Sequence, residues 1–345
     1  MSQVDETVVS SDGSGSSRRG RRRKGGGGDR SIVPEAEFTS YYGRPIVKPS
    51  PWEHDIPAYL FAGGLAAGSS LLAAGADLTG RPTLRRAGRL TALGALGFSM
   101  GALVHDLGRP SRFLNMMRTV KLTSPMSVGT WILSAYGPFA GAAAAAEAVD
   151  MLPGRRRPAL LRLLAATGRP AGLVAGLTAP PVAAYTAVLL SDTATPSWHE
   201  AYRELPFVFV SSAAAAAGGM GMLSAPVAEA GPARRMALGG AVAELVMEQQ
   251  MERSMGITAE PLHQGRAGRL MKAAKVLTAA GATGTLLAGR SRAVAALSGA
   301  ALMAGSACTR FGVFEAGQAS AKDPKYTVVP QRGRLDQGVP VRYQG

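Results

Sequence analysis

HDLGRPSRFLNMMRTVKLTSPMSVGTW, residues 105–131, places five strong charges between two hydrophobic runs that carry none. Residues 90–104 upstream are apolar and rich in Gly and Ala, and residues 128–146 downstream are again uncharged. A basic, Pro-containing segment between two such runs is typical of a loop at a membrane surface. The sequence therefore predicts two membrane helices joined by this loop, and we expect polar chemistry to gather there.

Other apolar blocks repeat this pattern along the 345 residues of the chain. Residues 57–76 and 205–228 contain no charged side chain, and each block is long enough to cross about 30 Å of hydrocarbon at about 1.5 Å per residue. The mean hydropathy is only +0.08 because long polar tails offset these blocks. The 44 glycines suit close-packed membrane helices, where small residues let backbones approach each other. We therefore expect an all-α integral membrane protein.

Eight transmembrane helices are predicted, arranged as two four-helix bundles with both termini on one side of the membrane. Their expected ranges are residues 57–76, 90–106, 125–149, 171–191, 205–228, 236–247, 270–289 and 293–309. The expected parts of the chain are a disordered basic tail of Gly, Ser and Arg (1–35), an interfacial segment (36–56), a first bundle (57–191), a second bundle (192–312) and a C-terminal tail (313–345).

A short similarity suggests that the two bundles are copies of each other. Trp52-Glu-His-Asp ahead of FAGGLAAG is echoed by Trp198-His-Glu ahead of FVFVSSAAAAAGG. Four predicted helices separate the two copies, so both would enter the membrane in the same direction. The sequence thus predicts a parallel internal repeat.

The net charge of +15 raises the question of nucleic-acid binding. The arginines, however, lie in the N-terminal tail and between apolar blocks, which is the pattern of loops that flank membrane helices. We expect the lipid bilayer, and no nucleic acid, as the partner of these charges. The short loops are rich in arginine, at 81–89, 155–162, 234–235 and 290–292. By the positive-inside rule, these loops mark the cytoplasmic side of a cell membrane, and both tails are then expected outside.

The chain has few residues that bind redox centres. Cys308 is the single cysteine, which excludes an iron–sulfur cluster or zinc site built by this chain alone. A membrane haem would need two histidines at one depth, and only His54 with His105 comes near that requirement. We expect neither haem nor cluster here, so electron transfer would require a redox partner.

Polar side chains converge on one expected end of the helices. They are His54, Asp55, His105, Asp106, Arg109, Arg112, Lys121, Tyr185 and His199. Each alone could be a snorkelling or capping group. Together they fit a pocket for an amphipathic quinone, which needs an apolar slot, a hydrogen-bond donor and a proton acceptor.

Acidic residues inside the predicted helices have two interpretations. Glu244 and Glu248 share one helix face at i, i+4 spacing, where a proton path is one interpretation. A water-facing or interfacial helix side is the other, which we favour. Glu147 and Asp150 lie beside Arg155, Arg156 and Arg157 in the sequence, and simple charge pairing is sufficient to explain them.

Four sequence motifs resemble the NrfD/PsrC family of polysulfide-reductase-type membrane subunits. They are WEHDIPAYLFAGGLAAGSS, HDLGRPSRFLNMMR with SPMSVGTW, YTAVLLSDT with WHEA, and RFGVFEAGQASAKDPKYTVVPQR. The resemblance extends over about residues 41–332 and implies an eight-helix, haem-free anchor that binds menaquinone or ubiquinone. It also implies a ferredoxin-like four-cluster iron–sulfur subunit and a molybdopterin-type catalytic subunit as partners.

Carried over residue by residue, the resemblance implies a quinone pocket built from His54, Tyr59, Asp106, Arg109 and Tyr185, and His105 is a further candidate. The chain would then be an electron-transfer subunit of an oxidoreductase without the catalytic centre itself. A membrane transporter and a passive anchor without a quinone site are the alternatives. The terminal substrate of such a complex is left open by these residues.

Overall fold

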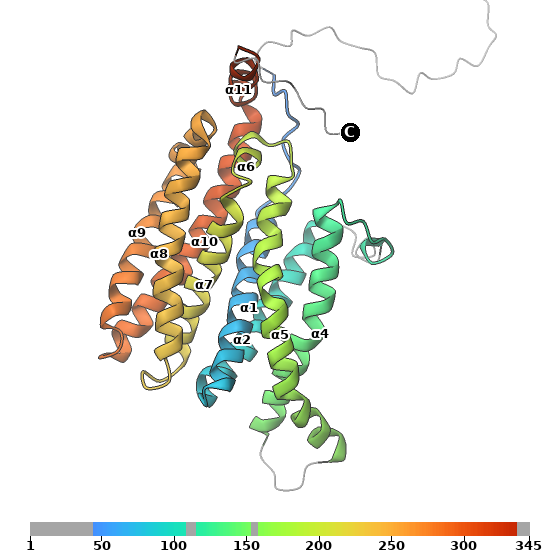
Figure 1. Cartoon of the computed structure of the whole chain (residues 1–345), viewed down its shortest axis with the longest axis vertical. Helices are drawn as coiled ribbons and strands as arrows, with labels where there is room; N and C mark the ends of the chain where they lie inside the picture. Colours follow the sequence, from blue (N-terminus) through green and yellow to red (C-terminus); the bar gives the residue numbers. More distant parts are fainter. Residues whose placement is uncertain (1–43, 108–114, 153–157, 337–345) are drawn as a thin grey trace, which may run out of the picture. The chain divides into compact units, whose positions relative to one another are not determined.

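The computed structural model describes residues 44–107, 115–152 and 158–336 (Figure 1). Every regular element among these residues is helical, which confirms the all-α prediction. The elements are α1 (Asp55–Leu78), α2 (Pro82–Asp106), α4 (Pro125–Met151), α5 (Ala159–Ser191), α6 (Pro196–Glu200), α7 (Leu205–Ser224), α8 (Gly231–Ser254), the 3₁₀ helix η1 (Gly256–His263), α9 (Gly265–Leu287), α10 (Arg292–Lys322) and α11 (Lys325–Asp336).

Six helices are long and apolar enough to cross a membrane, namely α1, α2, α4, α5, α7 and α10. This supports an integral membrane protein. Helices α8 and α9 are of similar length, with 24 and 23 residues, but they are not among these six apolar helices. The expectation of eight membrane crossings therefore stays a prediction.

Several helices are longer than predicted, among them α5, α8 and α10. Helix α5 already begins at Ala159, and α10 continues past residue 309 to Lys322. Residues 310–322 contain no proline, and α10 ends shortly before Pro324, as expected because proline disfavours helical geometry in the preceding residue. The first described part of the expected C-terminal tail is therefore helical.

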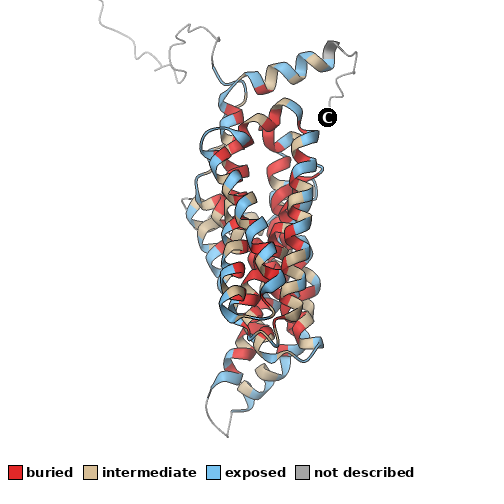
Figure 2. Ribbon diagram, turned by 90° about the vertical axis from the view of Figure 1, so that its left-hand side faces the viewer, coloured by how far each residue is buried: buried red, intermediate tan, exposed pale blue. Residues whose placement is uncertain are grey.

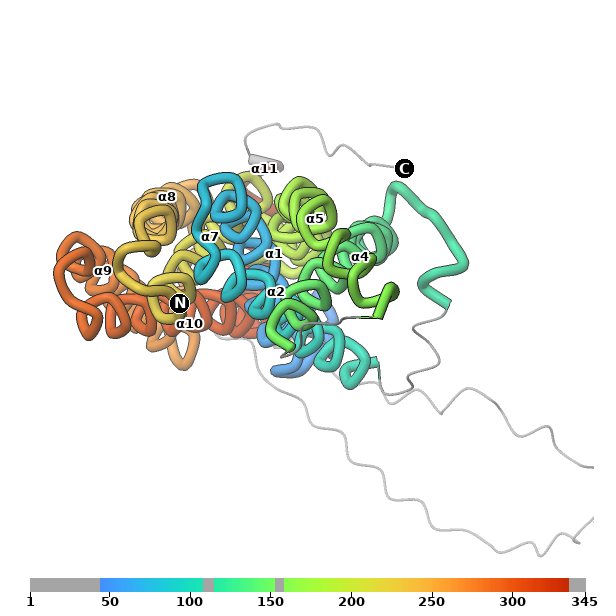
Figure 3. Tube along the Cα trace, turned by 90° about the horizontal axis from the view of Figure 1, so that it is seen from below, coloured from blue at the N-terminus to red at the C-terminus, as the bar shows by residue number. Residues whose placement is uncertain are grey.

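In cross-section, α1 and α7 lie in the middle of the bundle (Figure 3). Helices α4 and α5 lie to one side of them, and α8 and α9 lie to the other. The packing pairs α1–α2, α4–α5 and α1–α5 recur as α7–α8, α9–α10 and α7–α10. This recurrence agrees with the parallel repeat, which remains a prediction.

Glycines let α1 approach α7 closely. A Cβ added at Gly68 would lie 2.7 Å from Ala217 Cβ and 2.8 Å from the carbonyl oxygen of Ala213. Any larger side chain would therefore push the helices apart. Most of α1 is enclosed in this way, and Figure 2 shows the buried residues on helix faces that meet inside the bundle.

The water-facing interpretation of Glu244 and Glu248 is wrong. Both residues are only 1% exposed, because α8 packs against α7 and α9 and turns this face inward.

Charge pairing of Glu147 is confirmed, but its partners are arginines of α2. Arg85 Nε donates to Glu147 Oε1 at 2.5 Å, and Arg89 Nη1 donates to the same oxygen at 3.1 Å.

The long helices end at two opposite faces, the tail-bearing face and the basic-loop face. The tail-bearing face is formed by α6, η1 and α11, and the basic-loop face is formed by connections 79–81, 225–230 and 288–291. At the basic-loop face, Glu229 accepts hydrogen bonds from the backbone N–H groups of Thr83 (2.8 Å) and Leu84 (3.1 Å). Burial acts to raise the pKa of Glu229, but these hydrogen bonds lower it. The α7–α8 connection thus caps the first turn of α2.

Candidate functional site

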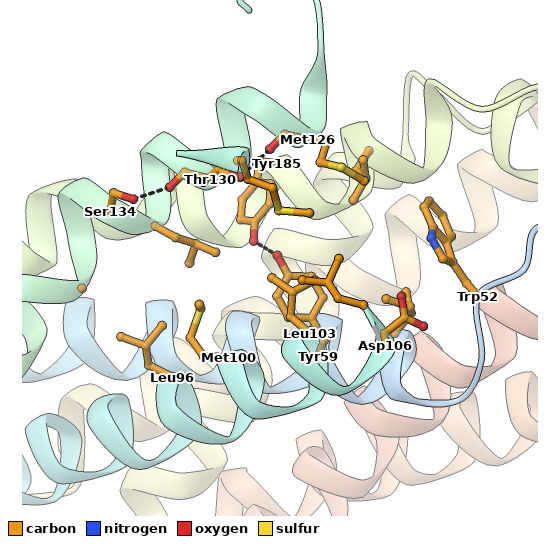
Figure 4. Close-up of a pocket in the computed structure, with 17 residues that line it drawn as sticks. Trp52, Tyr59, Leu96, Met100, Leu103, Asp106, Met126, Thr130, Ser134 and Tyr185 are labelled. Atoms are coloured by element: carbon orange, nitrogen blue, oxygen red, sulfur yellow. Dashed lines mark hydrogen bonds between the residues drawn. The ribbon is translucent and has the colours of Figure 1, made fainter. Parts of the chain in front are cut away.

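A cavity of about 270 Å³ lies among α1, α2, α4 and α5 (Figure 4). Its walls are mostly apolar because long Leu and Met side chains project into it from three helices. These residues are Leu96, Met100, Leu103, Met126, Leu133 and Leu189. The cavity reaches the last residue of α2, Asp106, and so lies toward the tail-bearing face.

Two tyrosines meet inside this apolar cavity. Tyr59 comes from α1 and Tyr185 from α5, and their hydroxyl groups are hydrogen-bonded to each other (Figure 4). Both side chains are buried, with exposures of 4% and 8%. One hydroxyl donates to the other, so the second proton of the pair remains available to an acceptor in the cavity.

Helix α4 makes room for the Tyr185 ring. Gly129 lies directly against this ring, and a Cβ at that position would overlap its Cε2 and Cδ2 atoms. The hydroxyls of Thr130 and Ser134 donate within α4, to the carbonyl oxygens of Met126 (2.9 Å) and Thr130 (2.8 Å). Of the hydroxyl groups of Thr130, Ser134 and the two tyrosines, it is therefore the tyrosine pair that keeps a proton free for a ligand.

Asp106 places a carboxyl group at one end of the cavity, near Trp52 (Figure 4). The Asp106 carboxylate accepts a hydrogen bond from the backbone of Glu53. The neighbouring His105 is exposed, and its Nδ1 lies 2.6 Å from Asp55 Oδ2. A half-buried acid thus adjoins a water-accessible titratable pair, an arrangement that can pass protons between the cavity and the surface.

The structure brings Tyr59, Asp106 and Tyr185 together in one cavity lining. His54 and His105 do not line it: His54 Nε2 lies 3.0 Å from Glu315 Oε1, and His105 pairs with Asp55. Arg109 lies outside the described residues. The proposed roles of all six positions stay predictions. Within the described ranges, no group of His, Cys, Asp or Glu is arranged to hold a metal ion.

Several lining residues were not predicted to be site residues. Met126, Gly129 and Thr130 belong to the SPMSVGTW motif, which was the available signal for them. Trp52 belongs to the repeated Trp motif, and its ring stacks on Trp198 with centroids 6.0 Å apart. The two copies of that motif thus meet beside the cavity.

Comparison with models of known protein families gives a match. The family model described as "Polysulphide reductase, NrfD" matches residues 46–236, more than half of the chain. The matched range contains every residue that lines the cavity. A search of curated proteins found no match.

Proposed function

We propose, since this chain belongs to the NrfD family, that it binds a quinone or quinol in the α1–α2–α4–α5 cavity as the electron-transferring membrane subunit of a multi-subunit oxidoreductase. The observation that carries this proposal is the buried hydroxyl pair of Tyr59 and Tyr185 within apolar walls, with Asp106 at one end. Menaquinone and ubiquinone both combine a ring with two carbonyls and an apolar tail, so both match these groups.

The size of the cavity supports the same proposal. Ligand pockets commonly enclose about 300 Å³ or more, and the cavity here, at about 270 Å³, is close to that lower limit. It therefore suits a ring-sized headgroup, while an isoprenoid tail would extend into lipid.

A bound quinone would supply a couple of two electrons and two protons, and the chain's own residues would handle the protons. The free hydroxyl proton of the Tyr59–Tyr185 pair would hydrogen-bond to one carbonyl. Asp106 would carry a proton between the cavity and the rim, where His105 and Asp55 meet water. Arg109 would either hold Asp106 ionised or steady negative charge on the ring.

The redox partner would dock on the tail-bearing face. The chain has a single cysteine, Cys308, so electrons have to arrive from another subunit. A ferredoxin-like four-cluster iron–sulfur subunit paired with a molybdopterin-type subunit suits this role, because the cavity lies toward that face and the tunnelling distance would be short. By the positive-inside rule this face would be extracytoplasmic, in the cell membrane.

Cysteine crosslinking tests the docking face. Tyr202 is 51% exposed beside α6, whereas Thr79 is exposed at the basic-loop face. Tyr202→Cys should crosslink to the iron–sulfur subunit and Thr79→Cys should not. The reverse pattern would move the partner to the opposite face.

Quinol-linked turnover of the assembled complex tests the cavity. We expect Tyr185→Phe and Asp106→Asn each to lower the rate about 10² to 10⁴-fold, the usual cost of losing a positioned donor or proton carrier. Membrane insertion and partner binding should be unchanged. Near-normal turnover in both variants would instead indicate a passive anchor.

A further inference from the structure

Three glutamates follow one another at four-residue intervals on one face of α8. Glu252 lies near the end of the helix at the tail-bearing face, and its side chain is 17% exposed. Glu248 and Glu244 lie one and two turns deeper, and each is only 1% exposed. At about 1.5 Å per residue, Glu244 lies about 12 Å further into the bundle than Glu252. The acidic face therefore leads from water to the bundle interior.

Lys275 of α9 joins the outer two glutamates. Its Nζ lies 2.7 Å from Glu252 Oε1 and 3.6 Å from Glu248 Oε1. His263 Nε2, on the exposed side, lies 3.8 Å from Glu252 Oε2. Protonatable groups thus succeed one another at short distances from the surface as far as Glu248.

The inner end of this series has polar atoms that lack protein partners. Thr309 donates to Glu244 Oε1 at 2.8 Å. The Ser212 hydroxyl also lies close to this carboxyl group but donates to Ser306 Oγ at 2.8 Å, and Glu244 Oε2 is buried without a hydrogen-bond partner among the described residues. Arg310, 1% exposed, donates from Nη2 to the carbonyl oxygen of Phe209 at 2.6 Å, while its Nε and Nη1 also lack partners there.

Such atoms point to water between Glu244 and Arg310. Buried polar atoms in proteins are nearly always hydrogen-bonded, to protein or to ordered water. Glu244 is close enough to Arg310 for their charges to interact, yet a closed structural ion pair would use up the free oxygen and nitrogens. A hydrated end to the glutamate series accounts for all of them.

We propose that Glu252, Lys275, Glu248 and Glu244 form a proton-conducting half-channel from the tail-bearing face, with Glu244 as its inner terminus beside Arg310. A proton taken from water by Glu252 passes to Lys275 as that ammonium group gives one of its own protons to Glu248. Glu248 then protonates Glu244 through a water molecule that would bridge the partnerless oxygens Glu248 Oε1 and Glu244 Oε2. Each donor is reloaded from the outer side, so one proton moves inward and no oxidant or reductant is required.

The inner terminus lies against the helix that also lines the quinone cavity. A Cβ added at Gly64 of α1 would lie 3.4 Å from Arg310 Nη2, and Tyr59 is five residues earlier on the same helix. The half-channel is separate from the proton route at Asp106, which lies between α1, α2, α4 and α5. It gives this subunit a second way to exchange protons with the tail-bearing face.

Infrared spectroscopy of the assembled complex tests this proposal without quinone turnover. The carboxyl band of Glu244 is assigned as the one that Glu244→Gln removes, or that Glu244→Asp shifts if the Gln variant does not assemble. The rate at which this band shifts after transfer from H₂O to D₂O measures proton exchange at Glu244. We expect Glu248→Gln and Lys275→Met each to slow this exchange about 10²-fold or more.

Lys272→Met is the matched control, because Lys272 lies on the same helix, is exposed, and is outside the series. In this variant the rate of proton exchange at Glu244 should equal the rate in the unmodified complex. Equal rates in Lys275→Met and Lys272→Met, or unchanged exchange in Glu248→Gln, would overturn the half-channel. Because quinone takes no part in the measurement, failure of the cavity proposal would not affect it.

Discussion

The hydroxyl groups of Tyr59 and Tyr185 are hydrogen-bonded to each other, although the two residues are 126 positions apart in the chain. The contact crosses from α1 to α5 inside a mostly apolar cavity and leaves one hydroxyl proton for an acceptor there.

Removing either hydroxyl should affect turnover, but removing another buried hydroxyl should not. Tyr59→Phe should lower quinol-linked turnover about 10²-fold or more, because the remaining hydroxyl is no longer oriented by its partner. Tyr136→Phe is the control: Tyr136 OH lies 2.7 Å from Ser70 Oγ and donates to the Ala66 carbonyl oxygen at 3.0 Å, outside the cavity lining. It should cost about 1 to 3 kcal/mol of stability and leave the rate per folded complex unchanged. Equal rate losses in both variants would speak against a specific role.

Gly129→Ala should reshape the cavity, because the new Cβ would overlap the Tyr185 ring. The ring has to move, so the dissociation constant of a quinone analogue such as decylubiquinone should rise about tenfold or more, at about 1.4 kcal/mol per factor of ten. Gly141→Ala on the same helix meets nothing within 4 Å and should change neither binding nor stability appreciably. Binding titrations on the detergent-solubilised complex compare the two, and identical affinities would show that Tyr185 does not shape the binding space.

Acid should loosen the contact between α11 and η1. A hydrogen bond from Lys325 Nζ, 2.6 Å away, lowers the pKa of Glu260 below its ordinary value of 4.5. Stabilisation by this pair is therefore full above pH 4.5 and is lost as the pH falls through the lower, folded-state pKa. Amide hydrogen exchange in α11 should rise over that range, corrected for the intrinsic pH dependence of exchange. Glu260→Gln should remove the pH-dependent part, and a retained dependence would assign it to another group.

The Glu147 carboxylate should be required for the stability of the first four long helices. Its side chain is 1% exposed and contacts Arg85 and Arg89, so Glu147→Gln leaves the buried Arg89 charge poorly compensated, at about 3 to 5 kcal/mol. Arg169→Gln is the control, because Arg169 is 70% exposed where it pairs with Asp77, and such pairs contribute about 0 to 1 kcal/mol. Chemical unfolding in detergent measures both. Similar small losses would mean that water reaches the cluster.

The sequence pattern alone located the long helices. Three predicted site residues line the cavity, and the pattern alone had pointed to two of them, Asp106 and Tyr185. Uncharged blocks mark membrane helices because charges are costly in lipid, and Asp106 and Tyr185 stand at the ends of such blocks. Tyr59 came only from the family resemblance, since a tyrosine inside an apolar run gives no sign of the direction in which it points.

Side-chain orientation was the part that the sequence did not reveal. An i, i+4 pair such as Glu244 and Glu248 has the same spacing whether it faces water or a neighbouring helix. Burial depends on how α8 rotates against α7 and α9, which is set by contacts far apart in sequence. His54 likewise pairs with Glu315, 261 positions away.

The enclosure of α1 has a consequence for how the protein is made. Ribosomes deliver α1 before α7, yet the Gly64 and Gly68 surface of α1 fits against Ala213 and Ala217 of α7, which are synthesised more than a hundred residues later. Until then this small-residue surface faces lipid or another protein. The nascent chain should therefore depend on a membrane insertase or chaperone that shelters α1, and truncation before α7 should leave a product that quality-control proteases remove.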